Sequence, residues 1–437
     1  MESSKSAIII GAGVIGCAIA LQMSRKGYKT INIDKNPEVG YGSTSNSCAV
    51  VRFSYSSLAT TALAYEGYHY WKDWPNFLGV EDERGLATYN ECGHLMLKAN
   101  TDDRSQVLDF YKELGIPYEE WDNAKINDRL PLFNTKLCGP VVPIDDPAFW
   151  EEPALDGELA GGLFAPNAGY IGDPQLATHN LRRAVEATGS EFRLGERVVA
   201  VMHEGGRVTG IKLESGDEHY ADVVVNASGP YSGKINEMAG VLDGMAIKTK
   251  ALRREVHHLP SPPEFDFEKN GVMTSDDDLY LYYRPEIGNK VTIGSGDPPC
   301  DSQEWIEDPD NFNREFTESQ WTAQVFRAAR RMPNLPIPSK ASGVIDLYDV
   351  ADDWTPIYDC SDLLGFYMAV GTSGHQFKNA GVVGDLMAEL IDACEQGLNH
   401  DETPLSYKCR YTGQIINLNV FSRLRTIHQE SSFSVRG

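Results

Sequence analysis

Long apolar runs, positive charge and paired cysteines are all scarce in this 437-residue sequence. No hydrophobic run approaches the ~20 residues that cross a bilayer as a helix, so we expect no membrane span. Lysine and arginine number 39 against 63 aspartate and glutamate residues, a formal net charge of −24. This balance argues against nucleic acid and anionic membrane surfaces as partners, since both attract basic proteins. A small anionic substrate stays open, because a pocket can be locally positive.

The eight cysteines are scattered and include no C-x-x-C pair. This spacing disfavours both a disulfide framework and a zinc site, and it fits a reducing compartment. The first apolar strand follows Met1 so closely that we expect no signal peptide. Together these features predict a cytoplasmic protein. The length suggests two or three folding units, and the chain shows neither internal repeats nor low-complexity segments.

The most informative stretch is the β-branched run before Gly11, followed by Gly13 and Gly16 in G-x-G-x-x-G spacing. The first glycine suits a tight turn, the second a close approach of backbone to a pyrophosphate, and the third close packing of helix on strand. A helix beginning there offers unpaired N–H groups to phosphate. Asp34 ends the next strand and is placed to accept a ribose hydroxyl. A glycine-rich turn without a ligand is the alternative, but five elements in sequence favour a dinucleotide site.

The rest of the chain predicts an α/β protein with an α+β second domain. A small, hydroxyl-rich loop over residues 40–52 ends in Arg52. We assign residues 1–90, 155–230 and 336–398 to a discontinuous nucleotide-binding domain, and 91–154 and 231–335 to a mainly antiparallel substrate domain. Residues 399–437 form a C-terminal extension. Near its end the chain repeats the strand, glycine turn and helix pattern, with Phe366–Val370, Gly371–Lys378 and Gly381–Ala393 in these roles.

Four motifs carry a resemblance to glycine/D-amino-acid oxidase-type flavoproteins, the group with sarcosine oxidases, sarcosine and dimethylglycine dehydrogenases and D-amino-acid dehydrogenases. They are G-x-G-x-x-G with Asp34, the Gly42-Ser43-Thr44 loop, the run Val224 to Pro230, and the run Gly371 to Lys378. The resemblance spans residue 7 to about residue 398. It implies FAD rather than NAD, and a glutathione-reductase-like Rossmann domain carrying a substrate domain. A helix N-terminus at Gly371 to Gly374 would face the N1/O2 edge of the flavin.

The resemblance also implies which residues line the cofactor and substrate sites. Arg52 and Lys378 match a carboxylate clamp, in which an arginine fork and a lysine point charge hold an amino acid over the flavin. His375 is open between packing near the flavin and direct contact with it. The cofactor-binding set is Gly11, Gly13, Val14, Ile15, Gly16, Asp34, Lys35, Gly42, Ser43, Thr44, Val198, Ala227, Ser228, Gly229, Gly371, Ser373, Gly374, His375, Gln376, Phe377 and Lys378. The catalytic set is Arg52, Lys378, Tyr280, Tyr282 and Arg284.

The sequence departs from the family pattern where relatives attach FAD covalently. Asp346 stands at the position of the linking cysteine of some relatives, and Asn46 or Ser47 stands at the linking histidine of others. Cys48 lies close by, but a structural role suits it better. We therefore expect non-covalent FAD.

A second departure concerns oxygen. Tyr280 aligns with the lysine that similar oxidases use to activate oxygen, and a neutral phenol cannot stabilise superoxide-like charge as an ammonium does. This slightly favours a dehydrogenase over an oxidase. Tyr282 and Arg284 lie on the same expected strand, and alternation sends Tyr283 to its other face.

The leading hypothesis is an FAD-dependent oxidoreductase that oxidises the C–N bond of a small amino acid or N-methylated amino acid. Hydride would pass to flavin N5, and the imine would hydrolyse in water; oxygen or another acceptor would reoxidise the flavin. A D-amino-acid dehydrogenase is one alternative. Another is the flavin-bearing subunit of a hetero-oligomer, docked through apolar residues of the extension. A flavin protein without turnover is a third.

Overall fold

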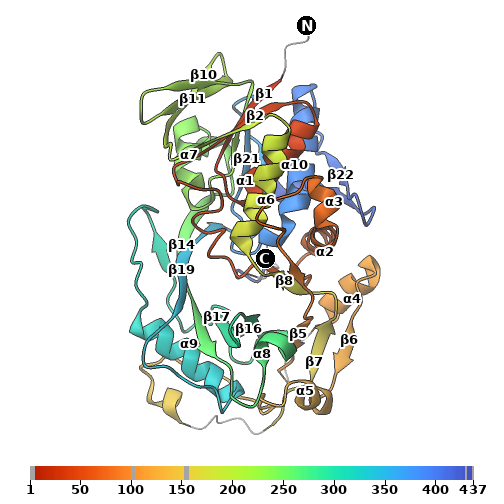
Figure 1. Ribbon diagram of the computed structural model, residues 1–437, viewed down its shortest axis with the longest axis vertical. Helices are drawn as coiled ribbons and strands as arrows, with labels where there is room; N and C mark the ends of the chain where they lie inside the picture. Colours follow the sequence, from red (N-terminus) through yellow and green to blue (C-terminus); the bar gives the residue numbers. More distant parts are fainter. Residues whose placement is uncertain (1–4, 100–103, 152–156, 429–430, 436–437) are drawn as a thin grey trace.

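The computed structural model describes residues 5–99, 104–151, 157–428 and 431–435. Two large sheets organise the chain, one in the upper half and one in the lower half of Figure 1. The α/β class with a mainly antiparallel second half is confirmed. The described helices are α1 (Val14–Arg25), α2 (Leu58–Lys72), α3 (Trp74–Leu78), α4 (Ser105–Leu114), α5 (Asn123–Arg129), α6 (Pro174–Ala187), α7 (Ser232–Ala239), α8 (Phe267–Asn270), α9 (Glu318–Arg331) and α10 (Ala380–Glu395).

The upper, six-stranded sheet is called the cofactor sheet, and its order is β20-β21-β13-β1-β2-β9. Neighbouring strands run parallel except β20, which pairs antiparallel with β21 at one edge. Parallel strands put their carboxyl ends at one edge, which is where such sheets bind ligands. The strands are β1 (Ser6–Ile10), β2 (Lys29–Asp34), β9 (Glu191–Leu194), β13 (Val223–Asn226), β20 (Ile357–Cys360) and β21 (Phe366–Val370).

Helices α1, α6 and α10 lie side by side against the cofactor sheet (Figure 1). Val14 to Met23 are buried without interruption, as expected of a helix covered on most sides. On α10, a Cβ at Gly384 would stand 2.6 Å from the Ala18 carbonyl oxygen. The missing side chain therefore lets α1 and α10 approach closely.

The lower, nine-stranded sheet has the order β18-β14-β17-β16-β15-β5-β7-β6, and β19 also pairs with β14. It is antiparallel except where β5 meets β15. Its strands are β5 (His94–Leu97), β6 (Glu119–Trp121), β7 (Gly162–Ala165), β14 (Thr249–Pro260), β15 (Met273–Asp276), β16 (Leu281–Glu286), β17 (Lys290–Ser295), β18 (Glu304–Ile306) and β19 (Gly343–Ala351). Three small sheets complete the fold: β10 (Val198–Glu204), β11 (Arg207–Leu213) and β12 (Glu218–Tyr220); β3 (Val50–Val51), β8 (Gly169–Ile171) and β4 (Tyr89–Asn90); β22 (Ser406–Lys408) and β23 (Ile415–Asn417).

The strand pairing moves two of the expected domain boundaries. β7 lies in the segment 155–230 and β19 in the segment 336–398, both assigned from the sequence to the nucleotide-binding domain. β7 pairs with β5 and β6, and β19 pairs with β14 over nine residue pairs, so both belong to the lower sheet. Pairing with strands far away in the sequence decides to which sheet β7 and β19 belong, and the local sequence pattern does not indicate it.

The C-terminal extension packs on its own chain. Its apolar patch consists of Ile415, Ile416, Leu418, Val420 and Phe421. Ile416, Leu418 and Phe421 are buried in the core, and Ile415 and Val420 are exposed. Arg423 pairs with Asp359 on β20 and with Asp401. The patch therefore gives little support to a docking site for another subunit. Assembly into an oligomer stays a prediction.

No helix in the described part of the chain has the length and apolar character needed to cross a membrane. The cytoplasmic location inferred from the sequence stays a prediction.

Candidate active site

A cavity of about 750 Å³ is lined by residues of both halves, a volume in the range of cofactor and substrate sites. Four of the five proposed catalytic residues, Arg52, Lys378, Tyr280 and Tyr282, line it. The proposed cofactor residues that line it are Gly11, Gly13, Val14, Ile15, Asp34, Lys35, Gly42, Ser43, Thr44, Val198, Ala227, Ser228, Gly229, Gly374, His375, Gln376, Phe377 and Lys378. Motifs far apart in the sequence thus meet around one space.

The turn between β1 and α1 forms one end of the cavity. Gly11 has φ +115°, and a Cβ there would stand 2.3 Å from the Ala227 carbonyl oxygen. Gly13 precedes α1 without a capping side chain, so N–H groups of the first turn are available to phosphate. Thr44 of the Gly-Ser-Thr loop accepts the Val14 N–H at 3.3 Å. This arrangement fits a pyrophosphate.

Asp34 is held by two backbone N–H groups. Its carboxylate accepts from Ala12 at 2.8 Å and from Asn36 at 2.8 Å, one bond to each oxygen. Each oxygen keeps a lone pair, so the carboxylate can still accept a hydroxyl from the cavity side. Burial raises the pKa of Asp34, and the two N–H bonds oppose that effect.

Three residues of the cofactor set lie outside the lining. A Cβ at Gly16 would stand 2.2 Å from the Gly11 carbonyl oxygen, so this glycine serves the packing of helix on strand. Gly371 donates to the Asp349 carboxylate at 2.6 Å, and the Ser373 N–H donates to the Asp349 carbonyl at 2.6 Å. Gly371 and Ser373 therefore shape the turn. Burial raises the pKa of Asp349 to about 7, while its bonds from Ser232 and Gly371 counteract the rise.

The expected helix N-terminus at Gly371 to Gly374 is wrong in position. A turn occupies these residues, a 3₁₀ segment follows at Phe377–Asn379, and α10 begins at Ala380. The turn is required because Gly374 has φ +74° and its α-carbon lies against the Tyr348 ring, where a Cβ would be 2.3 Å from the nearest ring atom. Backbone of the turn lines the cavity, and the helix axis starts further along.

His375 lines the cavity, but both of its ring nitrogens are engaged. Nε2 lies 2.9 Å from the Trp354 carbonyl oxygen, and Nδ1 lies 2.7 Å from Nε2 of Gln376. These partners require a donor at Nε2 and an acceptor at Nδ1, which is the neutral imidazole. Burial and the nearby Lys378 hold the His375 pKa well below its usual value. This geometry favours the packing role over a polar contact between ring and cofactor.

Arg52 and Lys378 meet at Tyr55, a residue that sequence reasoning missed. The Arg52 guanidinium carbon lies 4.5 Å from the centre of the Tyr55 ring, and Lys378 Nζ lies 4.6 Å from it. Lys378 donates to the Tyr55 hydroxyl and to the His375 carbonyl. Arg52 donates to the Ser54 carbonyl and to the Val435 carbonyl. Both cations are more than 90% buried.

Neither cation forms an ion pair with a carboxylate within residues 5–99, 104–151, 157–428 and 431–435. Burial, followed by the charge of Arg52, holds the pKa of Lys378 well below its usual value. An unpaired buried charge is costly, and an anion placed between the two groups would remove that cost. An anion such as a small carboxylate would therefore be stabilised in this part of the cavity.

Tyrosines form another wall. A Cβ at Gly294 would stand 2.1 Å from the Tyr282 ring, so the ring lies directly against β17, and its hydroxyl is 3.6 Å from Cys48 Sγ. Burial raises the pKa of the Cys48 thiol, which fits an inert structural cysteine. Tyr280 lines the cavity from a left-handed backbone position (φ +52°) just before β16, not from the strand as expected. Tyr348, also missed, faces the cavity beside the Arg254–Asp297 ion pair.

Arg284 does not belong to the site. It lies on the same face of β16 as Tyr282, but its guanidinium pairs with Glu286 and lies 4.5 Å from the centre of the Tyr170 ring. It is not part of the cavity lining. The alternation of side chains along β16 correctly puts Arg284 on the same face as Tyr282. Arg284 is two residues further along the strand, and this displacement takes its side chain past the cavity.

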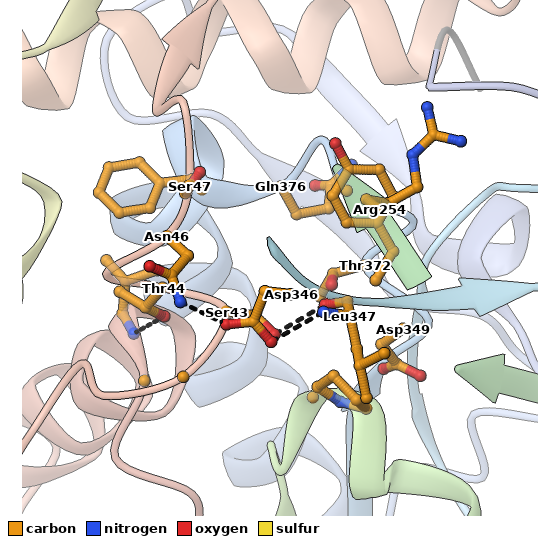
Figure 2. A pocket seen from close by; sticks show the side chains of 18 of the residues that line it. Ser43, Thr44, Asn46, Ser47, Arg254, Asp346, Leu347, Asp349, Thr372 and Gln376 are labelled. Atoms are coloured by element: carbon orange, nitrogen blue, oxygen red, sulfur yellow. Dashed lines mark hydrogen bonds between the residues drawn. The ribbon is translucent and has the colours of Figure 1, made fainter. Parts of the chain in front are cut away.

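The two positions at which relatives attach FAD meet in space. Figure 2 shows Asn46 pointing toward Asp346, and the amide nitrogen donates to the carboxylate at 2.6 Å. The Leu347 N–H donates to the other carboxylate oxygen at 2.7 Å. Asp346, Asn46 and Ser47 all line the cavity. The motif alignment therefore named two positions that lie together at the cavity, and their match to attachment sites stays a prediction.

Comparison with known proteins supports an FAD-binding oxidoreductase. A family described as FAD dependent oxidoreductase matches residues 6–390. FAD-dependent oxidoreductase domain-containing protein 1 of Bos taurus is 22% identical, over 88% of this chain and 80% of that protein. A D-amino acid dehydrogenase of Xanthobacter autotrophicus is 24% identical, over 88% and 94% respectively.

Solved structures share the fold. L-proline dehydrogenase from P. horikoshii has a TM-score of 0.71 at 19% identity, covering 90% of this chain and 95% of that one. Glycine oxidase from Geobacillus kaustophilus also has a TM-score of 0.71, at 16% identity, covering 97% and 99%. The glycine cradle, Asp34 and the cavity fit FAD, whose isoalloxazine accepts a hydride. The match over most of its length shows that this chain belongs to the FAD-dependent oxidoreductases and is an enzyme of the glycine/D-amino-acid oxidase type.

Proposed function

We propose that the protein oxidises the C–N bond of a small amino acid or N-methylated amino acid. The observation that carries the proposal is the pair of buried cations, Arg52 and Lys378, stacked about Tyr55 inside the cofactor cavity. A substrate carboxylate would complete this arrangement, as charge-assisted bonds to an arginine fork and an ammonium are strong. FAD, when bound in this cavity, would supply the hydride acceptor.

Each side chain has a distinct task. Arg52 and Lys378 hold the carboxylate and thereby fix the carbon that loses hydride, because transfer depends on close and oriented contact. Tyr55 keeps the two cations together through its ring and hydroxyl. Tyr282 and Tyr348 form an apolar wall that excludes water from the reacting carbon. The amine binds in its neutral form and we assign no general base.

Tyr280 bears on whether oxygen takes electrons from the reduced flavin. This position lines the cavity with a phenol, whereas a cation there would stabilise reduced oxygen species. We therefore favour a dehydrogenase that delivers electrons to an acceptor other than oxygen. A D-amino-acid dehydrogenase is the nearest alternative. FAD is non-covalent in this proposal, because an amide and a carboxylate stand at the two attachment positions.

An anaerobic titration of the flavin spectrum tests the proposal. D-amino acids, proline, sarcosine, dimethylglycine and glycine are added in turn, and bleaching of the flavin band names the electron donor. Admission of air then separates the two enzyme classes, since an oxidase recovers its colour rapidly and a dehydrogenase slowly. A flavin that no amine bleaches would contradict amine oxidation and favour a binding protein without turnover.

A further inference from the structure

Asp310 joins the two halves of the molecule across the cofactor cavity. It lies in the loop between β18 and α9, which belong to the lower half. Arg197 donates to its carboxylate at 2.9 Å and 3.4 Å, and the Tyr231 hydroxyl donates at 2.8 Å. Lys35 Nζ donates to the same carboxylate. All three partners belong to segments of the upper half.

Each partner belongs to the proposed cofactor set or lies close to it in sequence. Lys35 is a member, Arg197 directly precedes Val198, and Tyr231 is two residues after Gly229 in one 3₁₀ segment. One carboxylate therefore gathers three separate segments, each of which lines the cavity. Lys35 Nζ also lies 3.8 Å from the centre of the Tyr231 ring, so the partners contact one another.

The same loop covers part of the cavity. Pro309, Phe312 and Arg314 line it together with the three partners of Asp310. The Tyr231 hydroxyl also lies 3.0 Å from the Pro309 carbonyl oxygen. A second ion pair, Lys234 with Asp308 at 2.6 Å, anchors the start of this stretch. A loop of the lower half thus lines the cavity beside residues of the proposed nucleotide end.

The groups that pair with Asp310 are partly exposed, which suits contacts between loop and cavity wall that form and break reversibly. Asp310 and Arg197 are 36% and 40% exposed, so solvent and salt weaken their attraction. The bond from Arg197 is the main cause of the lowered Asp310 pKa, with the bonds from Lys35 and Tyr231 adding to it. A closure made of several exposed pairs opens more easily than one made of buried apolar contacts.

We infer that Asp310 is a positioning residue that retains FAD, holding the 307–317 loop over the ADP half of the cofactor. Release of FAD then requires all contacts of the Asp310 carboxylate to break. The inference needs bound FAD but is independent of the substrate, so it stands or falls separately from the proposed reaction.

The rate of FAD dissociation from the holoprotein tests it. Flavin fluorescence after dilution follows release in the wild type, Asp310→Asn, Asp310→Glu and Glu307→Gln. Glu307 is an exposed residue of the same loop, and its substitution removes the same charge. We expect Asp310→Asn to release FAD roughly three- to tenfold faster, since exposed pairs each contribute a factor of about 1.4 to 5. Asp310→Glu should lie closer to the wild type, and Glu307→Gln within about twofold of it.

Salt gives a second measurement that needs no substitution. Sodium chloride should speed release from the wild type and have a smaller effect on Asp310→Asn, which lacks the screened pairs. Thermal unfolding of the apoproteins distinguishes a role of Asp310 in retaining FAD from a merely structural role. A variant that is destabilised as apoprotein but releases FAD at the wild-type rate would overturn the inference. Equal acceleration by Glu307→Gln, or equal salt effects on both proteins, would overturn it too.

Discussion

The carboxylate site makes a sharp prediction about Arg52 and a matched arginine nearby. Arg52→Lys keeps the positive charge but removes the planar fork that can hold two carboxylate oxygens at once. Hydrogen bonds to charged groups contribute about 1.5–3 kcal/mol. Arg52 is almost fully buried, so solvent screens the loss little. We therefore expect a roughly 10- to 150-fold increase in the dissociation constant of a carboxylate ligand.

Arg284→Lys is the matched control. It makes the same chemical change at a buried arginine whose partners, Glu286 and Tyr170, lie outside the cavity lining. We expect its ligand affinity to stay within about twofold of the wild type. The assay is the shift of the flavin absorption band on titration with benzoate, repeated with neutral benzamide.

The comparison of ligands isolates charge recognition. Arg52→Lys should weaken benzoate and leave benzamide nearly unchanged, because only benzoate carries the anion that the fork recognises. Equal weakening of both ligands would indicate a general disturbance of the cavity and refute the clamp. Equal effects of Arg52→Lys and Arg284→Lys would refute the placement of Arg284 outside the site.

Three further outcomes follow from the same geometry. Tyr280→Lys should speed reoxidation of the reduced flavin by air, as measured by stopped-flow absorbance, since an ammonium then faces the cavity; an unchanged rate would remove Tyr280 from the account of oxygen reactivity. Benzoate affinity should fall as pH rises through the Lys378 pKa, which burial lowers from its usual value, because only protonated Lys378 attracts the anion; Lys378→Met should lose this dependence, and a persistent slope would exclude Lys378 as its source. Acid precipitation should leave all the flavin in the supernatant, and yellow, precipitated protein would contradict non-covalent FAD.

Local motifs predicted the nucleotide end well. The carboxylate of Asp34 bonds to backbone N–H groups no more than 22 residues away, and the G-x-G-x-x-G motif with its following acid describes that local geometry. Asn46 and Asp346, which the motifs matched to attachment positions, both line the cavity. Their hydrogen bond could not be foreseen, because 300 residues separate them in the chain.

The substrate end was only partly predictable. Arg52 and Lys378 were identified through the resemblance, but Tyr55 has no signal beyond its closeness to Arg52 in sequence. Val435 has none, since a carbonyl group is present at every residue and only the folded path of the extension brings this one to Arg52. β7 and β19 were misassigned for a related reason: a strand pattern does not name its partner.

The two attachment positions also bear on why a closure at Asp310 is useful. At the two positions matched to covalent attachment in similar flavoproteins, this chain has an amide and a carboxylate that bond to each other. FAD held without a covalent bond is retained by contacts that are each weak by themselves. The turn at Gly11 and the carboxylate of Asp34 would hold the ADP half from the side of the cofactor sheet. Asp310 adds the other half of the molecule, and it does so through residues adjoining the same motifs. A cofactor held from two sides leaves only after one side opens.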